Sequence, residues 1–242
     1  MKRRISVCLA LLAFLAGLVL FAYPVVNGLR LESKAADAVA DFEQNYTEPL
    51  PTSPAPPEAT PAPTPYNELL QVMWSYNEEI YLNGQSELSD PWSYAAVSID
   101  ISQYGIEDGV IAVLAIPKLE LKMPVYLGAS YDNMAAGAAH LTETSLPIGG
   151  DNTNCVIAGH RGWNGAPYFL NIEQLEVGDA VEVTNLWESL RYTVSEIKII
   201  EPYAVDEILI QPGRELLTLM TCQPPNTGGL YRYLVFCERA DP

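Results

Sequence analysis

The sequence has few of the side chains that carry out covalent or metal chemistry. Among its 242 residues are two histidines and four cysteines. Their spacing matches no metal-ligand cluster, and no glycine-rich phosphate loop or cofactor motif is present. We therefore expect neither a metal nor a cofactor. Apart from Cys8, which lies in an apolar run, the candidates for chemistry are His140, His160, Cys155, Cys222 and Cys237.

Basic side chains are also scarce. The chain has 13 lysines and arginines against 30 acidic residues, a formal net charge of −17. Four of the basic residues and none of the acidic ones lie in residues 1–30, so the remainder has nine basic and thirty acidic residues. Such an acidic body repels phosphate backbones, which argues against nucleic-acid binding. The content of 49% hydrophobic and 18% charged residues excludes a wholly disordered chain, and the length predicts one main domain with accessories.

A long apolar run occurs once, from Ile5 to Ala22. Its eighteen uncharged residues are about the minimum that crosses a bilayer. Lys2, Arg3 and Arg4 precede it, which predicts a cytoplasmic N-terminus and an extracellular remainder. The alternative is a cleaved signal peptide, but the sequence FAYPVVNG offers no convincing small-x-small cleavage site. We expect a single-pass anchor in the cell membrane with the remainder of the chain outside.

The chain beyond the anchor divides by composition. Residues 31–46 have helical composition, and residues 49–65 contain eight prolines in seventeen positions, which indicates an extended spacer. An apolar stripe with helical spacing returns in residues 67–82. We expect four segments: a cytoplasmic stub and transmembrane anchor at 1–30, a helical and proline-rich linker at 31–66, an N-terminal helix with the segment after it at 67–108, and a β-rich domain at 109–242.

The C-terminal segment has the pattern of a mainly β domain. Short runs of Val, Ile, Leu, Thr and Tyr alternate with Gly, Pro, Asn and Asp, and this spacing predicts seven or eight strands in a closed or nearly closed barrel. The expected strands are 110–116, 120–127, 155–159, 180–185, 190–201, 215–222 and 231–238, with one short helix near 131–137.

Side-chain alternation along the strands separates the candidate residues. In CVIAGH, Cys155 and His160 face opposite sides, and in YRYLVFC, Arg232 and Cys237 do the same. We interpret Cys155 and Cys237 as small strand residues, and a disulfide between them in an oxidising compartment remains open.

Three other residues lie where a substrate can reach them. Cys222 ends the strand ELLTLMTC before the irregular loop QPPNTGG, and His160 lies between a strand end and a loop. Arg232 lies in an otherwise apolar strand, so its charge requires an anion or a cleft. The alternatives are a buried inert cysteine and a structural histidine. Together the three suit acyl transfer: thiolate attack, proton transfer by imidazole, and hydrogen bonds from guanidinium to the developing oxyanion.

Four segments resemble the sortases, and among them the class C, pilin-polymerising group. They are TLMTC at 218–222, AGHRG at 158–162, YRYLVFCER at 231–239 and HLTETSLPIGG at 140–150. The resemblance covers roughly residues 109–239. It implies a sortase-like eight-stranded β-barrel with Cys222 as nucleophile, His160 as general acid/base and Arg232 as support for substrate and oxyanion. It also implies that Thr221 helps to shape the substrate pocket, whereas His140 is expected to be structural.

The segment SDPWS at 89–93 resembles the class C lid, an N-terminal loop laid over the active site. This implies that Asp90 pairs with Arg232 while Trp92, after Pro91, covers Cys222. The alternative is an ordinary Asp-Pro turn.

The resemblance implies an enzyme on the outer face of a Gram-positive-type cell. It would cleave an LPXTG-like sorting signal between Thr and Gly through a Cys222 thioester and transfer the acyl group to an amine. The expected partners are sorting-signal-bearing surface proteins or pilins, and the amine is that of a pilin lysine or of a peptidoglycan cross-bridge. A housekeeping-type sortase, a thiol hydrolase and a non-catalytic surface module are the alternatives.

Overall fold

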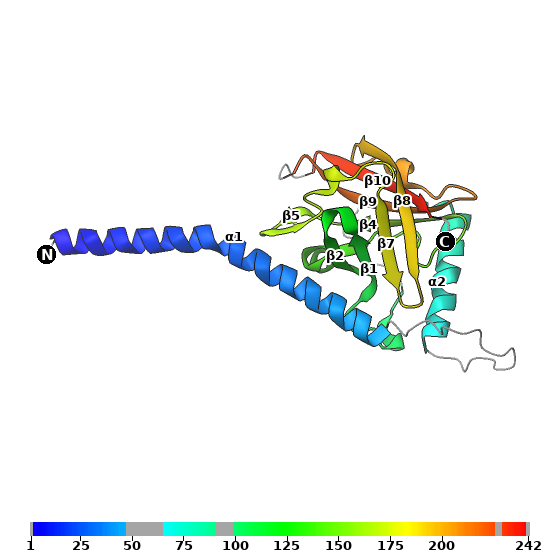
Figure 1. The fold of residues 1–242 in the computed structure, drawn as a ribbon, viewed down its shortest axis with the longest axis horizontal. Coiled ribbons are helices and arrows are strands. Elements are labelled where there is room, and N and C mark those ends of the chain that lie inside the picture. The colour runs from blue at the N-terminus through cyan, green and yellow to red at the C-terminus, as the bar shows by residue number, and fades with distance from the viewer. Residues whose placement is uncertain (1, 47–64, 91–98, 226–228, 241–242) are drawn as a thin grey trace.

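The computed structural model describes residues 2–46, 65–90, 99–225 and 229–240 (Figure 1). Most of the proline-rich spacer lies outside these ranges, as do Pro91 and Trp92 of the expected lid. The described residues form a barrel-shaped body from which one long helix projects (Figure 1).

Eight strands close into a barrel in the order β1-β2-β3-β4-β9-β10-β8-β7. A separate two-stranded hairpin, β5-β6, follows β4. The strands are β1 (Val110–Ile116), β2 (Leu121–Tyr126), β3 (Ala138–His140), β4 (Thr153–Ala158), β5 (Arg161–Trp163), β6 (Ala166–Tyr168), β7 (Ala180–Asn185), β8 (Ser189–Ile200), β9 (Glu215–Gln223) and β10 (Tyr231–Arg239). The predicted mainly β, eight-stranded barrel is confirmed.

The expected strands match the observed ones except for three short ones. The expectation contains neither β3 nor the hairpin strands β5 and β6, each of which is three residues long. A three-residue strand is too short to show the alternation on which the other predictions rest. The helix expected near 131–137 is α3 (Tyr131–Ala136), which begins after Ser130, whose hydroxyl caps it by accepting from the Asn133 amide.

Side-chain alternation fills the barrel interior with apolar groups, among them Cys155 and Cys237. Both cysteines lie opposite Leu217 of β9, Cys155 from β4 and Cys237 from β10. Two strand spacings, about 10 Å, therefore separate their backbones, whereas a disulfide needs Cα atoms within about 7 Å. Both thiols are free, so the disulfide left open by the sequence does not form in this fold.

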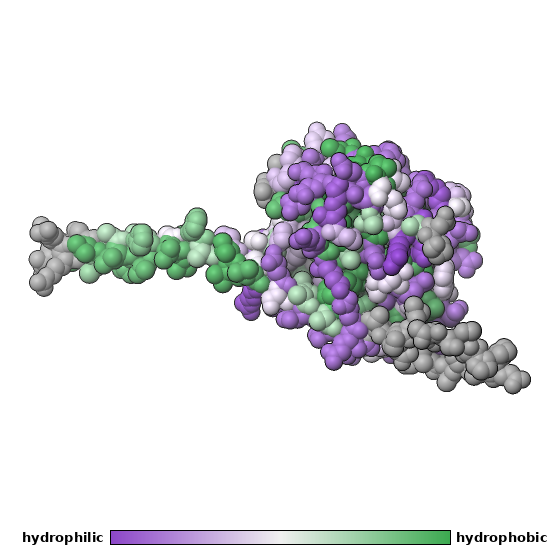
Figure 2. All heavy atoms as spheres, viewed as in Figure 1, coloured by the Kyte–Doolittle hydropathy of each residue, from purple (hydrophilic) through white to green (hydrophobic). Residues whose placement is uncertain are grey.

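The helix α1 (Lys2–Tyr46) runs unbroken through the boundary that we expected at residue 30. Its N-terminal half projects from the body with its apolar side chains exposed (Figures 1 and 2). Within the described ranges it is the one helix that is long and apolar enough to cross a membrane. Its most apolar stretch has a mean hydropathy of 2.5, and none of that stretch is buried. Its C-terminal half packs on the body through Val39 and Phe42.

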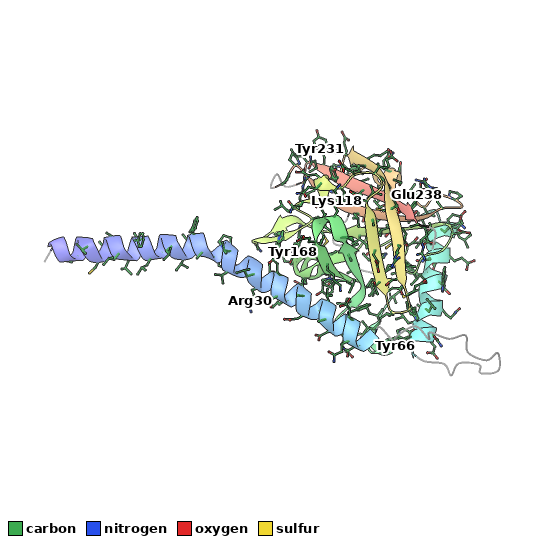
Figure 3. The ribbon with its side chains drawn as sticks, in the orientation of Figure 1. Arg30, Tyr66, Lys118, Tyr168, Tyr231 and Glu238 are labelled. Atoms are coloured by element: carbon green, nitrogen blue, oxygen red, sulfur yellow. The ribbon has the colours of Figure 1, made fainter. Side chains whose placement is uncertain are left out.

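The second helix, α2 (Pro65–Leu82), packs into an apolar cluster to which β1 also contributes. Its buried side chains are Leu69, Met73, Tyr76 and Ile80, and they form one apolar cluster with Val39 and Phe42 of α1. Tyr66 lies at one end of the body, and α2 carries the chain toward the other end, where Tyr231 begins β10 (Figure 3).

Polar contacts then fix the chain just after α2. The Gln85 side chain donates to the Glu143 carbonyl oxygen at 2.7 Å and accepts from the Ile210 amide at 2.6 Å. These two bonds hold the backbone five residues before Asp90, so the expected lid segment leaves α2 from a fixed point.

Candidate active site

The candidate site lies on the outer face of three adjacent barrel strands. β9 pairs in parallel with β4 and antiparallel with β10. The outward side chains of these strands form one apolar cluster, which includes Ala158, Met220 and Leu234. Ala158 lies opposite Met220, and Cys222 lies opposite Arg232. Two positions beyond Ala158 and Met220 on the same face come His160 and Cys222, so the topology brings the expected sulfur, imidazole and guanidinium to one end of neighbouring strands.

Every nitrogen of the buried Arg232 guanidinium donates a hydrogen bond. Nε and Nη2 donate to the two carboxylate oxygens of Asp90 at 2.6 and 2.8 Å, a bidentate ion pair. Nη1 donates to the carbonyl oxygens of Gly229 at 2.8 Å and Tyr231 at 3.2 Å. Nη1 also lies 3.9 Å from Cys222 Sγ. The expected contact between Asp90 and Arg232 is therefore present, and Trp92 is outside the described residues.

Cys222 is half-buried, with Gly229 packed against its sulfur. A Cβ atom added at Gly229 would lie 3.0 Å from Sγ and 2.6 Å from Arg232 Nη1. Burial raises the pKa of the Cys222 thiol to about 11, the Arg232 charge acts to lower it, and the Asp90 carboxylate acts to raise it. With Asp90 in place the sulfur is therefore a neutral thiol at pH 7.

His160 is buried against the hairpin that follows it. Its ring stacks on the indole of Trp163, with centroids 4.3 Å apart and planes 11° apart. The edge of Tyr131 contacts the same indole, at 6.0 Å between centroids. Burial lowers the pKa of His160 below its ordinary value. Both His160 and Cys222 are thus uncharged at pH 7 in this arrangement.

Thr221 lies on the opposite face of β9 from Cys222 and is fully buried. Its hydroxyl donates to the Gly159 carbonyl oxygen at 2.7 Å, and the Gly159 amide donates to the Met220 carbonyl oxygen at 3.0 Å. These bonds tie the end of β9 to the residue before His160. The contact supports a role for Thr221 in holding the two strand ends together.

His140 lies in β3 and is fully buried. Its Nε2 is 2.9 Å from the Thr144 carbonyl oxygen. Burial lowers the pKa of His140 to about 4, so its imidazole is neutral at pH 7. These surroundings are those of a structural histidine, as expected. Within the described ranges no group of three or more His, Cys, Asp or Glu side chains is placed to hold a metal ion.

The comparisons with known proteins identify the family. The family model of the sortase domain matches residues 114–240, more than half of the chain. This chain belongs to the sortase family.

Curated sortases align with it at moderate identity. Sortase A of Streptococcus agalactiae serotype III (strain NEM316) is 32% identical over 120 residues, which cover 48% of each protein. The chain thus spans about half the length of that relative. Sortase A of Bacillus anthracis is 25% identical over 226 residues, covering 91% of this chain and 88% of the relative.

Solved class C sortases have the same fold. The sortase C1 of the GBS pilus island 1 superimposes with a TM-score of 0.71 at 26% identity, covering 86% of this chain and 93% of that one. Sortase C-1 from Streptococcus pneumoniae gives a TM-score of 0.70 at 30% identity, covering 85% and 99%. The resemblance to class C that the sequence motifs suggest is confirmed.

Three residues of this sortase site escaped the sequence analysis. Gly229 holds Arg232 through its carbonyl oxygen, and Trp163 stacks on His160. Arg161, buried beside His160, pairs with Glu173 and lies 5.5 Å above the Tyr233 ring, and its charge acts to lower the Cys222 pKa. The glycine pair Gly228-Gly229 and a tryptophan three residues after His160 were visible signals, but no local rule assigns them these contacts.

Proposed function

We propose that this sortase is a membrane-anchored cysteine transpeptidase with Cys222 as nucleophile, His160 as general acid/base and Arg232 as oxyanion support. The observation that carries the proposal is the position of Arg232, whose Nη1 lies 3.9 Å from Cys222 Sγ on the adjacent strand. A guanidinium there donates to an oxygen next to the carbon that the sulfur attacks. Its substrate is a protein with an LPXTG-like sorting signal, as the class C resemblance implies.

The reaction proceeds in two acyl transfers. The Cys222 thiolate attacks the threonyl carbonyl carbon, and Arg232 hydrogen-bonds the resulting oxyanion. His160 in its imidazolium form protonates the departing glycine amine, so the Thr–Gly bond breaks and a thioester remains. An incoming amine then attacks the thioester and loses its proton to His160. The Cys222 thiolate leaves, and the new amide bond carries the acyl group.

Asp90 blocks this reaction in the arrangement described above. It engages Nε and Nη2 of Arg232 in a bidentate ion pair, so these two nitrogens face a carboxylate and not a substrate oxygen. It also opposes ionisation of Cys222. We propose that Asp90, Pro91 and Trp92 act as a lid and that substrate binding includes displacement of Asp90 from Arg232.

The apolar half of α1 supports a membrane location. Its exposed side chains include Leu12, Phe14 and Leu20, whose exposed fractions are 63%, 69% and 75% (Figure 2). A lipid environment stabilises such exposed apolar side chains. We propose that this segment spans the membrane once and that the barrel lies outside the cell.

The decisive experiment is mass spectrometry of the full chain in detergent or nanodiscs with a sorting-signal peptide. We expect an acyl adduct on Cys222 equal in mass to the peptide up to its threonine, and its absence in Cys222→Ala. Adding a pilin-like lysine peptide or a cross-bridge peptide should discharge the adduct into an amide product. Product from the lysine peptide supports pilus assembly, and product from the cross-bridge peptide supports wall anchoring. Hydrolysis with neither amine incorporated would replace the proposal with a thiol hydrolase.

A further inference from the structure

The helix α1 touches the hairpin that follows His160 in the sequence. Its backbone meets the tip of the β5-β6 hairpin: a Cβ atom added at Gly28 would lie 2.4 Å from the Gly165 carbonyl oxygen. In the other direction, a Cβ added at Gly165 would lie 1.8 Å from the Pro24 carbonyl oxygen. The Asn27 side chain donates to the Asn164 carbonyl oxygen at 3.0 Å. Two glycines therefore allow a backbone-to-backbone contact that no larger residue would permit.

The hairpin itself is short and well defined. Trp163 pairs with Ala166 across the turn formed by Asn164 and Gly165. Both turn residues have positive φ, 47° and 96°, as in the two-residue turns that match the twist of a hairpin. Such a tight hairpin moves as one piece, so a displacement of its tip reaches Trp163 directly.

The other end of the hairpin holds His160. Its first strand begins at Arg161, the next residue, and Trp163 stacks on the imidazole at 4.3 Å. After the second strand, the Phe169 amide donates to the His160 carbonyl oxygen at 3.0 Å. His160 is thus held through both its ring and its backbone by the segment that α1 contacts.

The contact lies where the anchor meets the body. Pro24 and Gly28 come within six residues of the end of the apolar run at Ala22. The hairpin strand β5 lies beside α1 where that helix reaches the barrel (Figure 1). Tyr168, at the end of β6, lies beside the part of α1 that carries Arg30 (Figure 3).

We propose that the contact between α1 and the hairpin positions the general acid/base. Gly28 and Asn27 fix the tip of the hairpin, and Trp163 of that hairpin fixes the orientation of the His160 ring by stacking on it. The inference rests on the proposed function, because it assigns these residues to the orientation of His160 in acyl transfer. In this view the membrane helix both anchors the sortase and completes its active site. Gly28, Asn27 and Trp163 are positioning residues.

The first test is Gly28→Ala in the full chain in nanodiscs, with Gly17→Ala as the matched control. Both changes replace glycine by a better helix former within α1, but Gly17 has nothing within 4 Å. We expect Gly28→Ala to lower kcat roughly tenfold or more with little change in KM, because the methyl group displaces the hairpin by about 1 Å. Gly17→Ala should keep the parent kcat. Equal kcat for both variants would overturn the inference.

A double-mutant cycle identifies the route. Trp163→Ala removes the ring that stacks on His160. In that background, Gly28→Ala should therefore cause no further decrease in kcat. Additive losses in the two variants would show that the contact acts by another route and would overturn the proposal. Asn27→Ala, which removes a hydrogen bond without a clash, should produce a smaller kcat loss that also disappears in the Trp163→Ala background.

A spectroscopic readout separates this inference from the proposed function. The chain has two histidines, so selective ¹³C labelling gives two imidazole signals, with the fully buried His140 as an internal reference. In the parent chain the stacked indole should shift the His160 ring protons upfield, and Gly28→Ala should reduce that shift. An unchanged His160 signal refutes the coupling, whatever the activity. If the parent chain forms no Cys222 adduct, the proposed function fails, while the His160 signal still decides the coupling.

Discussion

At the residue scale, the candidate site is controlled by which groups occupy Arg232. Asp90 takes Nε and Nη2, and the carbonyl oxygens of Gly229 and Tyr231 take Nη1. With these bonds made, each nitrogen of the guanidinium already has an acceptor, so a substrate oxygen has to compete with these partners for it. The bond that a moving lid can break is the ion pair to Asp90, because the other two are made by the loop and strand that carry Arg232 itself.

Removing the Asp90 carboxylate should therefore activate the thiol. In Asp90→Ala the Arg232 charge is uncompensated, so we expect the Cys222 pKa to fall from about 11 and the thiolate fraction at pH 8 to rise. Labelling by a thiol reagent should accelerate about tenfold for each pKa unit lost, as long as the thiolate remains the minor form. Asp151→Ala, which removes an exposed carboxylate at the opposite end of β4, is the control. Equal labelling rates in the two variants would contradict a closed Asp90 contact.

Gly229 is the second residue whose replacement is informative. Its φ is +79°, and a methyl group there would lie 2.6 Å from Arg232 Nη1 and 3.0 Å from Cys222 Sγ. We expect Gly229→Ala to reduce kcat/KM for transpeptidation by about a hundredfold, because it displaces both groups. Gly213→Ala is the matched control, since Gly213 has φ +73° but open space around it. A similar loss of activity in both variants would mean that backbone strain, and not the contact with the site, is responsible. No loss in either variant would contradict the prediction.

At the element scale, the two halves of α1 have different surroundings within one helix. Phe14 is 69% exposed in the projecting half, whereas Phe42 is fully buried between α2 and the barrel. Lys122 of β2 adds an ion pair to Glu43 at 2.5 Å. The second half of α1 therefore packs against the folded body.

This difference predicts unequal costs for the same substitution. Phe42→Ala should lower the free energy of unfolding of the body by about 3 kcal/mol, because it leaves a cavity in the cluster shared by α1 and α2. Phe14→Ala should leave that free energy unchanged. Urea unfolding of the two variants in detergent, followed by tryptophan fluorescence, measures both values. A Phe42→Ala variant as stable as the parent would place residues 31–46 outside the cooperative unit.

At the scale of the whole molecule, closure of the barrel buries polar groups as well as apolar ones. The short strand β3 closes the gap between β2 and β4, and it carries His140 into a fully buried position. A neutral imidazole fits there, bonded to the Thr144 carbonyl oxygen. A charged imidazole does not, since burial lowers the His140 pKa to about 4.

Stability should therefore fall in mild acid. The folded pKa lies below the ordinary value of 6.5, so between pH 6.5 and 4 the unfolded chain binds the proton more readily than the folded one. His140 should therefore contribute about 3 kcal/mol to the free energy of unfolding above pH 6.5. This contribution should be lost as the pH falls toward 4. Urea unfolding at a series of pH values should show a flatter profile for His140→Gln than for the parent. The same pH dependence in both proteins would show that His140 is not the group responsible.

Most of the fold and the identity of the candidate site residues followed from local patterns. Alternation along a strand is a property of the backbone, so it separated Cys155 from His160 and Cys237 from Arg232 before any strand was placed. The three short strands had no such pattern. The contacts of Gly229 and Trp163 could not be inferred either, because each depends on a neighbour from a different segment.

The amino-acid sequence alone determined the seven longer strands, the faces of their side chains, the apolar run and the motifs of the family, because these depend on residues close together in the chain. Only the tertiary structure decided that β9 lies between β4 and β10, and therefore that β9 keeps Cys155 and Cys237 too far apart for a disulfide. It also decided that α1 touches the hairpin after His160. Those relations join residues far apart in sequence, and they arise from closing the barrel and packing a helix against it.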